Sequence, residues 1–120
     1  METSIKSFED ACKALSRSTE VPDEAKFGKA AVAHYKLVTI AEALNEGWKP
    51  NWQNRSEWKH YPWFDMEKDE NNPSGFRFYD TRYGNASSDV GSRLCFKSEE
   101  LAIYAGNEFK ALYRDMMVIE

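Results

Sequence analysis

The sequence predicts an α+β domain over residues 1–120, in which about three helices pack on a small antiparallel sheet, a three-stranded meander. Apolar residues recur at helical spacing in three segments, and short alternating segments lie between turn-rich stretches. The order is helix, helix, an irregular aromatic segment, three strands and helix, which is typical of helices gathered on one face of a sheet. With 120 residues and 42% hydrophobic content, the chain is long enough for one core.

Two helices are predicted in the first half of the chain. The first begins after Ser7, whose hydroxyl can cap it, and its apolar stripe comprises Phe8, Ala11, Cys12 and Leu15. The second is predicted over about Glu24 to Glu46, where good helix formers dominate, and Gly47 follows it as a helix-ending glycine. Its stripe comprises Ala30, Ala33, Leu37, Ile40, Ala41 and Leu44.

Three strands and a third helix are predicted in the second half. The strands lie within KHYPWFDME (59–67), GFRFYDTRY (75–83) and SRLCFK (92–97), separated by turns rich in Asp, Asn, Ser and Gly. The third helix begins at Ser98, with Glu99 and Glu100 in its first turn. Its apolar face comprises Leu101, Ala105, Phe109, Leu112 and Met116.

All four tryptophans lie in the segment 48–64, which is neither helical nor strand-like in its pattern for most of its length. Such rings can fill gaps that short helices and a small sheet leave in a core, or they can form a binding surface. We expect most of them to act as a core plug, with one or two partly exposed. We expect Trp48 and Trp63 to be buried, and Trp52 and Trp58 to be more exposed because they lie in the polar stretch NWQNRSEWK.

Composition excludes several classes of protein. The net charge of −4 argues against broad affinity for nucleic acid or an anionic membrane. No apolar run reaches the length of a membrane span, and METSIKSFED has no signal-peptide core, so we expect a cytoplasmic location without membrane association. Cys12 and Cys95 are far apart and lie among apolar residues, which indicates buried free thiols.

The residues for catalysis or metal binding are few. His34 and His60 are the only histidines, and neither has a nucleophile or metal ligands at a recognisable spacing. An EF-hand loop starting at Asp65 would need glycine and an acid where Glu70 and Phe76 stand, so the acidic run is a solvated turn. We therefore expect no metal, no cofactor and no catalytic residue.

A candidate binding surface remains within the aromatic segment, where three basic residues interleave with the rings in an otherwise acidic chain. It comprises Trp52, Arg55, Trp58, Lys59 and His60. Interleaved cations and rings can hold single-stranded nucleic acid by charge and stacking. Exposed tryptophans can equally grip a protein.

Three stretches carry a resemblance to known proteins: ALNEGWKPNW, KHYPWF and RLCFKSEELAIYAGNEF. In these the chain resembles a family of small uncharacterised proteins from gut Bacteroides-type bacteria, their phages and integrated mobile elements. The resemblance runs over most of the chain and implies a bacterial cytoplasmic or phage origin. It brings no activity, cofactor or catalytic residue with it.

These observations favour a small non-enzymatic binding or accessory module of phage or mobile-element origin that acts through protein contacts. One alternative is a nucleic-acid-associated factor that uses the basic aromatic segment 48–64. The other is an enzyme of unrecognised type. The oligomeric state does not follow from the sequence.

Overall fold

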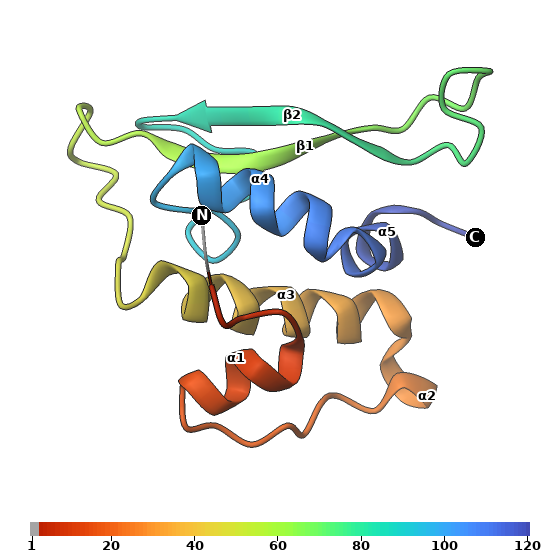
Figure 1. Ribbon diagram of the computed structural model, residues 1–120, viewed down its shortest axis with the longest axis horizontal. Coiled ribbons are helices and arrows are strands. Elements are labelled where there is room, and N and C mark those ends of the chain that lie inside the picture. Colours follow the sequence, from red (N-terminus) through yellow and green to blue (C-terminus); the bar gives the residue numbers. More distant parts are fainter. Residues whose placement is uncertain (1–2) are drawn as a thin grey trace.

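The computed structural model describes residues 3–120, which form five helices and one two-stranded antiparallel sheet. The elements in order are α1 (Phe8–Ala14), α2 (Glu24–Phe27), α3 (Lys29–Asn45), β1 (Lys59–Asp65), β2 (Arg77–Gly84), α4 (Glu99–Glu108) and α5 (Lys110–Met117). The α+β class is confirmed. The β1–β2 hairpin forms one layer, α4 and α5 lie beneath it, α3 follows, and α1 and α2 lie beyond α3 (Figure 1).

Local capping signals are confirmed at two helix starts. Ser7 accepts a hydrogen bond from the Asp10 N–H at 3.0 Å and begins α1. Ser98 accepts one from the Leu101 N–H at 3.2 Å and begins α4. A side-chain oxygen at these positions satisfies a backbone donor that the helix itself leaves free.

The second and third helices are each divided in two, so the prediction of about three helices is wrong. Gly28 separates α2 from α3 with a φ of 87°, a left-handed value that interrupts the helix and that glycine adopts without strain. Ala30 is exposed in the first turn of α3, whereas the rest of the predicted stripe, from Ala33 to Leu44, is buried. Phe109 separates α4 from α5 and remains buried at the junction, with 5% exposure.

The sheet has two strands rather than three. The predicted third strand is reduced to one bridge, in which His60 and Phe96 exchange backbone hydrogen bonds of 3.0 and 2.7 Å. The next residue of β1 that faces this side is Pro62, which has no N–H to donate. In the other direction the chain reaches Ser98, which already caps α4. The ladder therefore cannot extend either way.

One hydrophobic cluster joins α1, α3, the hairpin, α4 and α5. Gly106 of α4 allows the hairpin to lie against this helix, because a Cβ there would be 2.5 Å from Phe78 Cδ1 and 2.8 Å from Pro62 Cβ. Cys12 and Cys95 are free and buried, as predicted. Among residues 3–120, none of the helices combines the length and apolar character that a membrane crossing requires.

Candidate functional site

The four tryptophans do not plug the core, so that expectation is wrong. Trp48 and Trp52 are half-buried, Trp58 is 47% exposed and Trp63 is 37% exposed, and none belongs to the core cluster. The exposure of Trp58 is confirmed, but the predicted burial of Trp63 is wrong. Trp63 and Phe64 are consecutive residues of β1 and face opposite sides of the strand, so that Phe64 is buried in the core and Trp63 lies on the outer face.

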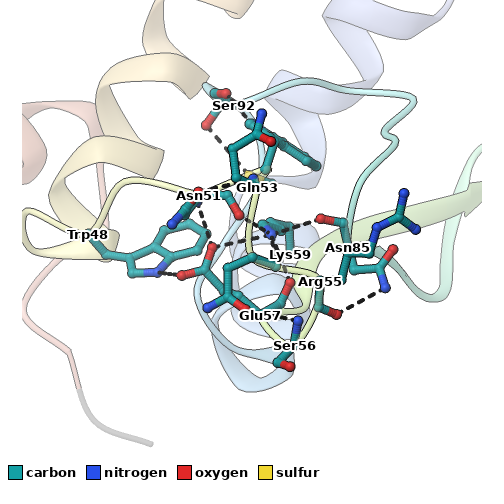
Figure 2. A network of polar contacts seen from close by, with 12 residues as sticks. Trp48, Asn51, Gln53, Arg55, Ser56, Glu57, Lys59, Asn85 and Ser92 are labelled. Atoms are coloured by element: carbon teal, nitrogen blue, oxygen red, sulfur yellow. Dashed lines mark hydrogen bonds and ion pairs between the residues drawn. The ribbon is translucent and has the colours of Figure 1, made fainter.

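Lys59 is the centre of the loop that precedes the hairpin. It is 1% exposed, and its Nζ donates to the backbone carbonyls of Asn51, Asn54, Glu57 and Asn85 at 2.6, 3.1, 2.8 and 2.9 Å (Figure 2). The Glu57 carboxylate lies 3.4 Å from the same nitrogen. An ammonium has three hydrogens, so these acceptors share them. One buried cation thus joins the loop to the chain that leaves β2.

Two tryptophans are held by the same network. Trp48 Nε1 donates to Glu57 Oε2 at 3.3 Å, and Trp52 Nε1 donates to Ser92 Oγ at 2.7 Å. The Trp52 ring also lies 5.1 Å from Lys59 Nζ. The Asn51 N–H lowers the pKa of the Glu57 carboxyl most, with further contributions from Lys59 and Trp48. Trp48 and Trp52 therefore have a structural role.

The five sequence-predicted surface residues do not form one surface. Lys59 is inside the protein, a correction to its expected place on the surface, because four carbonyls surround its ammonium. Trp52 is half-buried beside it, and Arg55 is exposed, with its backbone carbonyl accepting from Asn85 Nδ2 at 3.0 Å. Only Trp58 and His60 come together at an accessible site.

That site is an open pocket of about 360 Å³, which we call the Trp58 pocket. Its lining residues are Trp58, His60, Asp80, Thr81, Tyr83 and Glu99. The rings of Trp58 and Tyr83 meet edge to face at 5.0 Å, and Tyr83 is 62% exposed. Two carboxylates and two exposed rings therefore border one hollow, contributed by the residue before β1, by β2 and by the first turn of α4.

His60 lies on the inner side of this pocket as a neutral group. Its Nδ1 is buried and has no hydrogen-bond partner among the described residues. Burial lowers the pKa of its imidazole, and the Glu99 carboxylate opposes that shift only in part. At neutral pH the imidazole is uncharged, so the two acids set the charge of the pocket.

The hairpin register determines which backbone groups of β2 are free. His60 uses both its N–H and its C=O to bond Phe96, so it faces away from β2. Its partner across the sheet, Tyr83, is then in a non-hydrogen-bonded pair and directs its own N–H and C=O away from β1. Thr81, two residues earlier, does the same. No strand within residues 3–120 pairs with β2 on that side, which lies at the margin of the molecule (Figure 1).

Charged side chains lie along this free edge. The Asp80 carboxylate accepts the Thr81 N–H at 2.8 Å and so covers one of the outward donors. Arg82 is turned to the opposite face, where its guanidinium lies 4.3 Å from the centre of the Trp63 ring. Asp80 shares that face by its register partner Trp63, but its carboxylate bonds the outward Thr81 N–H and therefore lies at the edge itself, where Asp80 also lines the Trp58 pocket.

The Cys95 thiol is not an activated nucleophile. Burial raises the pKa of the Cys95 thiol to about 11, so the thiolate is scarce at neutral pH. Residues 3–120 contain no cluster of three His, Cys, Asp or Glu side chains that could hold a metal ion. A larger groove of about 580 Å³ lies beside Trp48, with Val38 and Leu15 on its apolar side.

Comparisons with known protein families, with curated proteins and with solved structures find no match for this chain.

Sequence reasoning missed four residues of the pocket: Asp80, Thr81, Tyr83 and Glu99. Alternation along RFYDTRY places Thr81 and Tyr83 on one face, a signal that was present in the sequence. The register that brings this face to Trp58 depends on a bulge and on an eleven-residue connection, Met66 to Phe76. No sequence pattern predicts the position of the bulge or the path of this connection.

Proposed function

We propose that this protein is a small non-enzymatic binding module that acts through protein contacts and holds an extended segment of its partner against β2. The observation that carries the proposal is the free edge of β2 beside an exposed aromatic pocket. Outward-facing backbone groups at Thr81 and Tyr83 can pair with another strand. Strand addition of this kind gives affinity through main-chain hydrogen bonds and specificity through pockets for alternate side chains.

The exposed rings beside β2 also favour a role in protein binding. Trp58 and Tyr83 meet edge to face, and they lie directly before β1 and within β2. Aromatic residues are enriched at the centres of protein interfaces because they bury a large area with few rotatable bonds. A pocket of this kind next to a free strand edge offers one place for a partner side chain.

A nucleic-acid-associated role for segment 48–64 has less support. Of the three basic residues there, Lys59 is bonded internally, which leaves Lys49 and Arg55. The Trp58 pocket is bordered by Asp80 and Glu99, which repel a phosphate backbone. An enzymatic role has less support because the buried Nδ1 of His60 bonds neither hydroxyl of the pocket, that of Thr81 or that of Tyr83.

A phage or mobile-element origin is also proposed, on the resemblance in three sequence stretches alone. A binding module fits that origin, because it needs only a surface and a partner. Sequencing the genes that flank this one would test the origin without reference to the binding site.

A displayed library of random peptides tests the binding proposal. Thr81→Pro removes an outward N–H that an added strand would need, and it leaves the hydrogen bonds between β2 and β1 intact. Thr81→Val is the matched control, because it keeps this N–H. We expect the wild type and Thr81→Val to enrich the same alternating peptides, and Thr81→Pro to lose them although its urea midpoint is retained. Absence of enrichment, or equal enrichment on all three proteins, would contradict the proposal.

A further inference from the structure

The charge and the shape of the Trp58 pocket together define the side chain that it would take. Its rings, Trp58 and Tyr83, present π-systems, and its carboxylates, Asp80 and Glu99, supply negative charge. A cation over an aromatic face is attracted by the ring quadrupole, and Trp is the most favourable ring. Carboxylates at the rim attract a cation as well. An acidic or neutral side chain would gain neither.

From this geometry we infer that the partner segment is basic and places one lysine or arginine side chain in the Trp58 pocket when it pairs with β2. This inference rests on the proposed function and specifies its partner. Thr81 and Tyr83 point their side chains to the face that carries the pocket. In an added strand, the residue opposite them points its side chain to the same face, which is where the rings and acids lie.

The Asp80 carboxylate gives a reason why a cation is needed. In the free protein it accepts the Thr81 N–H at 2.8 Å, so it blocks a donor that an added strand requires. A partner with a lysine supplies a replacement for that bond, since its ammonium can bind the carboxylate as the strand takes the N–H. A partner without a cation takes the Thr81 N–H from this exposed carboxylate and leaves it only water in return, which disfavours that partner.

The overall charge acts in the same direction. The chain carries a net charge of −4, and Arg82, a cation of β2 itself, lies over Trp63 on the other face. The neutral state of His60 keeps a competing positive charge out of the pocket. A basic segment is therefore attracted at long range and is not opposed within the pocket.

The test uses three synthetic peptides in which threonine and valine alternate around one central residue: lysine, norleucine or glutamate. Affinity and binding position are both read from amide and indole NMR shifts of the full chain. We expect the lysine peptide to shift the Thr81 and Tyr83 amides and the Trp58 indole. It should bind about tenfold more tightly than the norleucine peptide, a ratio typical of one cation–π contact with one exposed ion pair. The glutamate peptide should bind least.

Two variants separate a local effect of charge from a general one. Asp80→Asn removes one acid inside the pocket, and Glu100→Gln removes one from the exposed first turn of α4, outside the pocket lining. We expect Asp80→Asn to lose most of the preference for lysine and Glu100→Gln to keep it. Trp58→Ala should also lose it, and an unchanged urea midpoint for Asp80→Asn keeps the comparison valid if Trp58→Ala is less stable.

The outcomes distinguish the two proposals. Equal binding of the lysine and norleucine peptides at β2 would overturn the cation inference and leave strand addition standing. Shifts away from β2 with every peptide would overturn both. The cation inference is also overturned if a single-stranded oligonucleotide shifts the same amides, or if they shift with protein concentration alone, which would make a second copy the occupant.

Discussion

Replacing Lys59 by methionine should destabilise the protein by about 3 kcal/mol, the range expected when one partner of a buried ion pair is removed. Methionine keeps most of the apolar stem but has no ammonium. The carbonyls of Asn51, Asn54, Glu57 and Asn85 then lose their common donor, and the Glu57 carboxylate loses its counter-ion. Each unsatisfied buried group would cost about 1–3 kcal/mol if water could not reach it.

The expected loss is smaller than the sum of these terms because the loop is near the surface. Asn51 and Asn54 are exposed residues, so water can reach their carbonyls once the loop relaxes. Glu57 also keeps the N–H groups of Asn51 and Trp48 as donors. The larger part of the cost should therefore come from the lost link to Asn85, which ties the loop to the end of β2.

Urea unfolding measures the change, with Lys49→Met as the matched control on the same segment. Lys49 is exposed, and its replacement should change the free energy of unfolding by less than about 0.5 kcal/mol. A cycle with Glu57→Gln should give a coupling of about 1 kcal/mol or more between residues 57 and 59. A loss within about 1 kcal/mol of zero for Lys59→Met would refute the reasoning, because it would mean that the loop holds its shape without the ammonium.

Three further predictions concern the core, the hairpin contact and pH. Phe109→Ala should cost about 3–5 kcal/mol and Lys110→Ala well under 1 kcal/mol in urea melts, since only the first empties a buried site, and equal losses would contradict the placement of this helix face. Gly106→Ala should cost about 1–3 kcal/mol by pushing the hairpin off α4, although alanine favours helix, so a gain in stability would argue against the close contact. Because burial lowers the pKa of His60, the unfolded chain binds more protons below about pH 6.5, and stability should fall on acidification through that range. His60→Gln should flatten this dependence and the exposed His34→Gln should not; an unchanged slope in His60→Gln would be inconsistent with a buried neutral imidazole.

The elements that the sequence predicts correctly are those with local causes. Ser7 and Ser98 cap helices through hydrogen bonds to the N–H three residues later, so a few neighbouring residues are enough to predict each cap. Gly28 interrupts a helix that its neighbours favour, and its effect depends on how α2 and α3 meet, which is tertiary. The lost third strand has a local reason in Pro62, but only once the partner of His60 is known to be Phe96.

The candidate site could be predicted from the sequence only where its features have local causes. Trp58 was expected to be exposed because polar residues surround it, and it is. Lys59 has the same polar neighbours yet is buried, because its acceptors come from the chain after β2 as well as from its own loop. A lysine is seldom fully buried, so neither the residue type nor its polar neighbours indicated that Lys59 would bond backbone carbonyls inside the protein.

Strand alternation explains how one short stretch contributes both to the internal network of Lys59 and to the Trp58 pocket. Trp58 and His60 point to one side of the chain and Lys59 to the other, since successive side chains of a strand alternate. The buried ammonium fixes the backbone between two pocket residues, so the pocket is held by a group that never touches its occupant. Lys59→Met should consequently weaken binding at Trp58 even at temperatures where the variant remains folded, because a mobile ring binds with a greater loss of entropy. The tryptophans thus divide by their surroundings: Trp48 and Trp52 donate to internal acceptors and build the loop, whereas Trp58, directly before β1, and Trp63, within it, are exposed.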